Sequence, residues 1–304
     1  MSKVVVTGGA GFIGHHLVKA LHERGDKVIV IDNLAGGRFD GRVVTGVEMS
    51  AYDIADPENE HLLLDDFAGA DYVVHLAALP RVQASIEDPV GTARVNVLGT
   101  VAVLNAARKA GVKRVVFASS SSVYGDSDQL PLHEDMPTEP MSPYARHKVQ
   151  GEEYCRDYAV LFNVETVCLR FFNVYGPGAD PNGAYALVVA KFLEQKRNGE
   201  KMTITGDGEQ TRDFTHVRDV VRAILLAAES PEVGMGEAIN IGGGRQISVN
   251  TVADLIGGKT VYIESRLEPH DTLADIRKAK RLLNWEPQIS FEEGIEELKS
   301  LNSD

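Results

Sequence analysis

Tyr144 and Lys148 stand four residues apart in the stretch SPYARHK, residues 142–148. Ser142 is a favoured N-cap residue and Pro143 a favoured first helical residue, so a helix is predicted to begin here. Residues four apart share one face of a helix. An ammonium group beside a phenol, close to a helix N-terminus, favours the phenolate. The pair therefore predicts a proton-transferring tyrosine, although the same spacing also fits a core tyrosine followed by a solvated lysine.

A glycine-rich turn in the stretch VVVTGGAGFIG joins an apolar run to a helical pattern. Gly9, Gly11 and Gly14 fit the pattern GxGxxG, and Gly8 with Gly11 and Gly14 fits GxxGxxG. Backbone amides of such a turn and the helix N-terminus can hold a pyrophosphate. The next apolar run ends in Asp32, whose carboxylate would accept hydrogen bonds from an adenosine ribose. Because this charge repels a 2′-phosphate, the pattern predicts NAD rather than NADP.

Short apolar runs alternate with longer helical patterns in the first half of the chain. The runs KVVVTG, KVIVIDN, DYVVHLAA, VKRVVFASS and VETVCLRFF, and later EAINIGG, are typical of strands buried on both faces. Helices are predicted at 12–24, 90–110 and 143–162. The alternation predicts an α/β fold, a doubly wound Rossmann-type parallel sheet with a smaller, partly interleaved C-terminal lobe. We expect domains at 1–169 and 170–304, with some later segments returning to the first.

Composition narrows the possible partners. The 304 residues hold 31 basic and 44 acidic side chains, a net charge of −13, which argues against binding to nucleic acid or to an anionic membrane surface. Cys155 and Cys168 form no disulfide framework and have no metal-ligand spacing, so no metal is expected. No apolar run reaches membrane-spanning length and the N-terminus does not resemble a signal peptide, so we expect a cytoplasmic protein.

In order along the chain, a series of motifs resembles those of extended short-chain dehydrogenases/reductases, in particular the NAD-dependent nucleotide-sugar epimerases. They are TGGAGFIG, DI at 53–54, HLAA at 75–78, NVLGT at 96–100, SSSSVYG at 119–125, SPYARHK, RFFNVYGPG at 170–178, GDGEQTRDFTHVRDV at 206–220 and LADIRKAKRLLNWEP at 273–287. The resemblance covers almost the whole chain. It implies that 1–169 binds NAD and that 170–304 binds a nucleotide sugar.

By this resemblance, Asp53 and Ile54 would lie along the adenine, and Lys148 would bind the nicotinamide ribose. The full set of residues implied to contact NAD is Gly8, Gly11, Phe12, Ile13, Gly14, Asp32, Asn33, Asp53, Ile54, Leu76, Ala77, Ala78, Asn96, Tyr144 and Lys148.

The resemblance also implies a catalytic group, in which Ser120 works with Tyr144 and Lys148 on a sugar hydroxyl. Arg266 stands one residue after the position where the family commonly has a phosphate-binding arginine, which here is Ser265. The residues implied to contact the substrate are Ser120, Ser121, Ser122, Asn173, Arg212, Arg266 and Thr272. Ser121 and Ser122 fit equally well as polar turn residues.

The implied reaction is NAD-dependent 4-epimerisation of a UDP-hexose through a 4-keto intermediate. Dehydratase relatives carry acidic residues where this chain has Ser121 and Ser122, and uronate-handling relatives usually have threonine at the position of Asn173. The alternatives are a uronate epimerase, a dehydratase or a non-catalytic NAD-binding sensor. The small side chain of Thr272 predicts room for N-acetylated hexoses. A homodimer through the helices at 90–110 and 143–162 is also expected.

Overall fold

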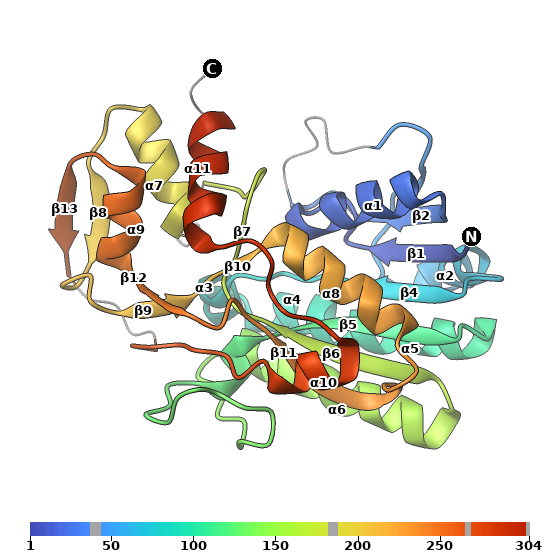
Figure 1. Ribbon diagram of the computed structural model, residues 1–304. Helices are drawn as coiled ribbons and strands as arrows, with labels where there is room; N and C mark the ends of the chain where they lie inside the picture. The colour runs from blue at the N-terminus through green and yellow to red at the C-terminus, as the bar shows by residue number, and fades with distance from the viewer. Residues whose placement is uncertain (37–43, 182–187, 265–268, 302–304) are drawn as a thin grey trace.

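Seven parallel strands form the main sheet of the protein, which a computed structural model describes for residues 1–36, 44–181, 188–264 and 269–301. Their order across the sheet is β11-β6-β5-β4-β1-β2-β3. The strands are β1 (Lys3–Thr7), β2 (Lys27–Ile31), β3 (Glu48–Ser50), β4 (Tyr72–His75), β5 (Arg114–Ser120), β6 (Glu165–Phe171) and β11 (Met235–Ile241). The predicted doubly wound α/β fold is confirmed (Figure 1).

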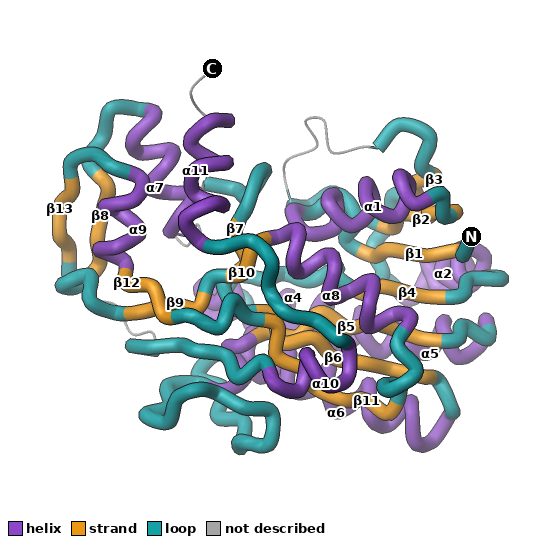
Figure 2. Tube along the Cα trace, viewed as in Figure 1, coloured by secondary structure: helices purple, strands orange, loops and turns teal. Residues whose placement is uncertain are grey.

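Helices cover both faces of this sheet, which explains why its strands are apolar on both sides. One face packs against α1 (Phe12–Arg24), α8 (Val217–Glu229) and α10 (Arg277–Leu283). The other packs against α2 (Glu60–Phe67), α5 (Gly99–Ala110) and α6 (Pro143–Phe162). Figure 2 shows α1 and α8 side by side on one face. The helices predicted at 12–24 and 143–162 are confirmed.

The strand order reverses direction between β1 and β4. From β1 the chain continues through β2 to β3 at one edge of the sheet, and from β4 it continues through β5 and β6 to β11 at the other edge. In open α/β sheets, ligands bind outside the carboxyl ends of the strands at such a switch point. The short elements near this edge are η1 (Pro57–Asn59), α3 (Val82–Glu87), α4 (Pro89–Ala93), η2 (Arg94–Leu98) and η3 (Ser121–Tyr124).

A second lobe lies at the left of Figure 1 and has its own apolar core. The rings of Phe214 and Phe291 stack there at 4.8 Å, and Tyr175 packs edge-on to Phe214. Its elements are β7 (Val174–Tyr175), α7 (Val188–Arg197), β8 (Met202–Thr205), β9 (Thr211–Asp213), β10 (Thr215–His216), β12 (Gln246–Ser248), α9 (Val249–Ile256), β13 (Thr260–Ile263) and α11 (Phe291–Leu301). Strands β7 with β10, β8 with β13 and β9 with β12 form two-stranded sheets.

Later segments of the chain join the first lobe, because β11 pairs with β6 and α8 packs beside α1. The expected division into 1–169 and 170–304 stays a proposal, with β11, α8 and α10 as the returning segments.

A continuous helical stretch runs from Pro89 to Ala110, through α4, the π-helical turn η2 and α5. By length and composition alone it could cross a membrane, whereas the sequence predicted no apolar run of membrane-spanning length. In the fold, Val103 and Leu104 of this stretch are fully buried in the core beneath the sheet. The cytoplasmic location expected from the sequence stays a prediction.

Candidate active site

The glycine-rich turn between β1 and α1 leaves no space for side chains. Gly8 has a φ of +72°, and a Cβ atom there would lie 2.6 Å from the amide nitrogen of Ala77. A Cβ on Gly14 would lie 2.2 Å from the carbonyl oxygen of Gly8. Gly11 takes the N-cap position of α1 and has no side chain to occupy the first helical amides. This tight turn can therefore present its amides to an anion.

Asp32 lies at the end of β2, beside this turn. Its carboxylate accepts hydrogen bonds from the backbone amides of Ala10, at 3.0 Å, and Leu34, at 2.8 Å. The next residue, Asn33, accepts a hydrogen bond from the amide of Ala35 at 3.1 Å. The predicted ribose-binding carboxylate is thus held against the glycine-rich turn by local backbone bonds.

A buried hydrogen-bond chain links the turn to the π-helical turn η2. Thr7 bonds His75 Nδ1 at 2.7 Å, His75 Nε2 bonds Thr100 at 3.0 Å, and Thr100 donates to the carbonyl of Asn96 at 2.7 Å. Burial lowers the pKa of His75 to about 3, so its ring is neutral. The Asn96 side chain in turn bonds the amide and carbonyl of Leu79.

This chain holds the ends of β1 and β4 in one arrangement, and Leu76, Ala77 and Ala78 follow directly after β4. Thr7 and Thr100 were missing from the predicted site. In the sequence, Thr7 stands beside the glycine-rich turn and Thr100 ends the motif NVLGT. Neither position indicates that His75 contacts Thr7, 68 residues away, or Thr100, 25 residues away.

At the predicted adenine end, Asp53 accepts a hydrogen bond from the amide of Ala55 at 2.9 Å and forms an ion pair with Arg94 at 2.7 Å. Ile54 is buried behind it. Phe12 and Ile13 form the first turn of α1 and are half-buried. The residues predicted to contact the cofactor therefore lie at or near the carboxyl edge of β1, β2, β3, β4 and β5.

Helix α6 begins where the sequence predicts. The Ser142 hydroxyl accepts a hydrogen bond from the amide of Ala145 at 3.2 Å, with Pro143 in the first turn. The Tyr144 amide donates to the Ser85 hydroxyl of α3 at 3.0 Å. One turn on, Lys148 is buried and its Nζ donates to the Ala118 carbonyl of β5 at 2.7 Å.

The expected stabilisation of a Tyr144 phenolate by Lys148 stays a prediction, because the two groups have other partners in the structure. Lys148 Nζ lies 5.8 Å from the centre of the Tyr144 ring and is bonded to a carbonyl oxygen instead. Burial raises the pKa of Tyr144, and only a hydrogen bond with Ser120 lowers it. Burial also lowers the pKa of Lys148 to about 8. The spacing does place both residues on one face of α6, and desolvation by burial is the largest influence on the pKa of each group.

Ser120 ends β5 and contacts both Ser122 and Tyr144. Its Oγ accepts hydrogen bonds from the Ser122 hydroxyl at 2.9 Å and from the Ser122 amide at 3.2 Å. A hydroxyl has one proton and two acceptor sites, so the Ser120 proton is left to be donated to Tyr144 or to a substrate oxygen. Ser122 thus acts as a turn residue that orients Ser120, while Ser121 begins η3.

The predicted substrate residues of the second lobe meet around Asp213. Asn173 Nδ2 donates to the Asp213 carbonyl at 3.0 Å, and Thr272 Oγ1 accepts from the Asp213 amide at 3.2 Å. Arg212 donates from Nη1 to the carbonyl oxygens of Thr211 and His270, both at 2.9 Å. Asn173 lies two residues after Phe171, which is the neighbour of Ser120 across β5 and β6. Arg266 lies outside the described residues.

Asp213 itself was not predicted as a site residue. Its buried carboxylate accepts hydrogen bonds from the amides of Gly243 at 2.6 Å, Gly244 at 3.1 Å and Ala274 at 2.9 Å. Burial raises its pKa to about 7 against the effect of these bonds. Asp213 follows Arg212 directly, but the loops that it joins are distant in sequence. Thr272 is buried within this arrangement.

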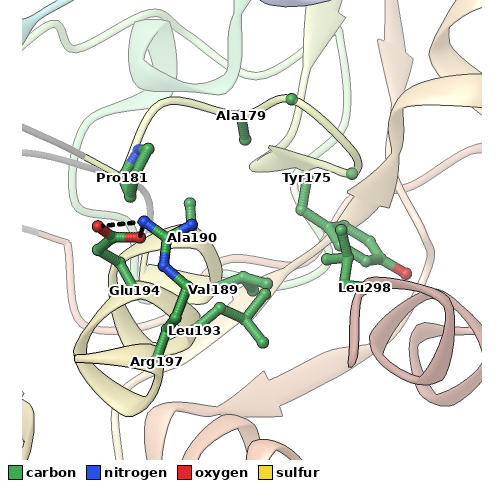
Figure 3. Close-up of a pocket in the computed structure, with 11 residues that line it drawn as sticks. Tyr175, Ala179, Pro181, Val189, Ala190, Leu193, Glu194, Arg197 and Leu298 are labelled. Carbon is green, nitrogen blue, oxygen red and sulfur yellow. Dashed lines mark hydrogen bonds and ion pairs between the residues drawn. The ribbon is translucent and has the colours of Figure 1, made fainter. Parts of the chain in front are cut away.

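Figure 3 shows a separate pocket of about 230 Å³ between the loop after β7, α7 and α11. Glu194 and Arg197 of α7 form an ion pair at 2.6 Å on one side, and Tyr175 and Leu298 lie on the other. Ser120, Tyr144 and Lys148 are not part of its lining. Among the described residues, no cluster of three or more His, Cys, Asp or Glu side chains could hold a metal ion.

Comparison with known proteins agrees with this geometry. A model of the NAD dependent epimerase/dehydratase family matches residues 4–242. A UDP-glucose 4-epimerase of Mycolicibacterium smegmatis is 39% identical over 306 residues, which cover 96% of each chain. A UDP-glucuronate 4-epimerase of Thermodesulfobacterium geofontis is 35% identical over 316 residues, with 97% of this chain and 94% of that protein covered.

Among solved structures, a UDP-glucose 4-epimerase of Thermotoga maritima with UDP-glucose superposes with a TM-score of 0.92 at 38% identity, covering 98% of this chain and 97% of that one. One conclusion follows from these matches, which cover nearly the full length of the chain, together with the glycine-rich turn and the group of Ser120, Tyr144 and Lys148. The chain belongs to the NAD-dependent epimerase/dehydratase family and uses NAD as its cofactor.

Proposed function

We propose that this protein is a UDP-sugar 4-epimerase that interconverts UDP-glucose and UDP-galactose and also accepts their N-acetylated forms. The observation that carries the proposal is that Ser120, at the carboxyl end of β5, interacts with the Tyr144 side chain, which lies one turn before the buried Lys148 on α6. Such a group can move a proton at a sugar hydroxyl. Support for a UDP-sugar comes from the Thermotoga maritima relative, which was solved with UDP-glucose.

The residues of the first lobe fit NAD. The turn at Gly8 and Gly14 has space only for backbone, which suits a pyrophosphate, and Asp32 is held beside it to accept ribose hydroxyls. The buried Lys148 amine lies at the same carboxyl edge of the sheet, where it bonds the Ala118 carbonyl of β5. When bound, NAD supplies the hydride acceptor and a positively charged nicotinamide.

The chain's own residues bind the sugar and move its proton. We propose that Ser120 donates a hydrogen bond to the C4 oxygen while Tyr144 Oη takes the C4 hydroxyl proton and later returns it. Lys148, with a pKa of about 8, carries a positive charge near neutral pH and favours the ionised tyrosine once its Ala118 bond is exchanged for a ligand. Arg212 and Asn173 would hold the diphosphate, because a guanidinium matches phosphate oxygens.

Two features favour a 4-epimerase over a dehydratase or a uronate enzyme. The residues after Ser120 are the serines of η3, which offer no carboxylate for elimination of water. Asn173 stands where uronate relatives usually have threonine, and its amide bonds the Asp213 carbonyl. The N-acetylated substrates rest on the small size of Thr272 alone.

A panel of UDP-hexoses, their N-acetyl forms and UDP-glucuronate, followed by NMR of the anomeric protons, tests the proposal. We expect UDP-glucose and UDP-galactose to equilibrate and UDP-glucuronate to remain unchanged. Turnover of the uronate alone, or loss of water from the hexose, would identify one of the alternative enzymes. Absence of any turnover, with NAD still bound, would favour a sensor.

Asp32→Ala should weaken NAD binding by about tenfold, because the hydrogen bonds to the ribose are lost. It should also reduce the preference for NAD over NADP, because the carboxylate no longer repels the 2′-phosphate. Fluorescence titration with NAD and NADP measures both effects. The matched control is Asp26→Ala just before the same strand, where the carboxylate bonds the amide of Ser2 at 2.9 Å and pairs with Arg24 at 2.6 Å. An unchanged preference in the Asp32 variant would contradict its role.

The homodimer stays a prediction, and exposed apolar side chains support it. Val90 and Leu98, on the helical stretch from Pro89 to Ala110, are 79% and 60% exposed, and Leu161 on α6 is 68% exposed. Burial of such side chains against a second copy would remove them from water. Light scattering should give twice the 33.0 kDa of one chain, and Leu98→Glu should reduce it toward one chain. A 33.0 kDa particle for the unmodified protein at micromolar concentration would refute the dimer.

A further inference from the structure

A buried ion pair lies behind the catalytic group. Glu152 is 5% and Arg170 4% exposed, and their contact is bidentate, with Arg170 Nε 2.8 Å from Glu152 Oε1 and Nη2 2.7 Å from Oε2. Glu152 also accepts a hydrogen bond from the Ser119 hydroxyl. Arg170 Nη1 donates to the Tyr124 hydroxyl at 2.9 Å.

The network continues to the second lobe. Tyr124 donates to Asn240 Oδ1 at 2.7 Å, and Asn240 Nδ2 donates to the carbonyl of Leu132 at 2.9 Å. Leu132 pairs with Ala274, two residues after Thr272. One continuous buried network thus runs from the catalytic strand β5 to the loop that carries Thr272.

Each member of the ion pair is next to a residue of the proposed site. Ser119, which donates to Glu152, precedes Ser120, and Glu152 lies one turn after Lys148 on the same face of α6. Arg170 is the neighbour of Ser119 across β5 and β6 and lies three residues before Asn173.

We propose that the Glu152–Arg170 ion pair is a positioning pair, which ties the strand that ends in Ser120 to the strand that leads to Asn173 and places a carboxylate one turn beyond Lys148. Neither residue was among the predicted site residues. The proposal rests on the proposed proton transfer at Tyr144, but its main test is independent of turnover.

The charge of Glu152 has a direct consequence for Lys148. Burial lowers the pKa of Lys148 to about 8, while Cys155, the nearby Glu152 carboxylate and Cys168 raise it. Removal of that carboxylate should therefore lower this pKa further, and the amine would lose its proton at a lower pH. The other titratable or charged groups beside Lys148 are Tyr144, His147 and Cys155 on α6, Cys168 and Arg170 on β6, and His75 on β4.

The chain offers a matched control at the opposite end of the same two strands. Arg114 of β5 pairs with Glu165 of β6, with Nε 2.9 Å from Oε2, and Arg114 is 3% exposed. Glu152→Gln and Glu165→Gln each remove one carboxylate that pairs with a buried strand arginine, close to Lys148 in the first variant and at the far end of β5 and β6 in the second.

The test is NMR of protein labelled with ¹³C at lysine Cε, with the Lys148 signal assigned by its loss in Lys148→Met. We expect the titration midpoint of Lys148 to fall by about one pH unit in Glu152→Gln and to stay in place in Glu165→Gln. If the protein is active, the alkaline limb of kcat against pH should move the same way, with kcat at pH 8 lowered about fivefold and KM changed less.

A Lys148 midpoint that is unchanged in folded Glu152→Gln, or that shifts equally in both variants, would overturn the proposal. Because an unpaired buried arginine destabilises a protein, Glu152→Gln could fail to fold. The double variant Glu152→Leu with Arg170→Met removes both charges and decides in that case. A lowered midpoint in the double variant, smaller in size than in Glu152→Gln because the repelling charge of Arg170 is removed as well, supports the proposal, and a wild-type midpoint overturns it.

Discussion

Tyr144→Phe is expected to lower kcat by about a thousandfold, the size of effect typical of a lost general acid or base. The phenylalanine ring can still pack against the same neighbours, and the backbone amide that bonds Ser85 is unchanged. Only the hydroxyl that meets Ser120 is removed. The fold and NAD binding should therefore persist while proton transfer is lost.

Steady-state kinetics with UDP-galactose and the NAD content of the purified protein measure the two parts of this prediction. Tyr154→Phe on the same helix is the matched control, since Tyr154 is 37% exposed and lies ten residues further along α6. Turnover within a few-fold of wild type in Tyr144→Phe would show that this tyrosine does not transfer the proton. Loss of NAD together with activity would indicate a structural role instead.

Gly14→Ala is expected to weaken NAD binding by about a hundredfold, the equivalent of about 3 kcal/mol for overpacking a rigid turn. The added Cβ would meet the Gly8 oxygen at 2.2 Å and the Gly9 Cα at 2.7 Å, and both are backbone atoms that no side-chain rotation can move. The glycine-rich turn would have to open, and its amides would no longer converge on one anion.

Calorimetric titration with NAD measures this loss, and thermal unfolding shows how much of it reflects stability. The control is Gly36→Ala, because a Cβ on Gly36 meets no atom of the described residues within 4 Å. Equal NAD affinity in Gly14→Ala and the wild type would show that the turn does not hold the dinucleotide.

Much of the fold and part of the site could be read from short stretches of sequence. The start of α6 depends on Ser142 and Pro143, which act on the nearest turn of backbone, and the structure has the helix there. The glycine-rich turn and Asp32 depend likewise on contacts within one β-α-β unit. The apolar runs predict strands because both faces of the sheet are covered.

The tertiary structure decided what depends on burial and on distant contacts. The sequence places Lys148 one turn from Tyr144, but only the fold shows that burial lowers the pKa of the lysine and raises that of the tyrosine. Asp213 joins loops some 30 and 61 residues away, and Tyr124 meets Asn240 across 116 residues. Spacing along a chain determines which residues share a face or a turn. The charge and partners of a buried group depend instead on which segments exclude water from it, and that is known only once the chain is packed.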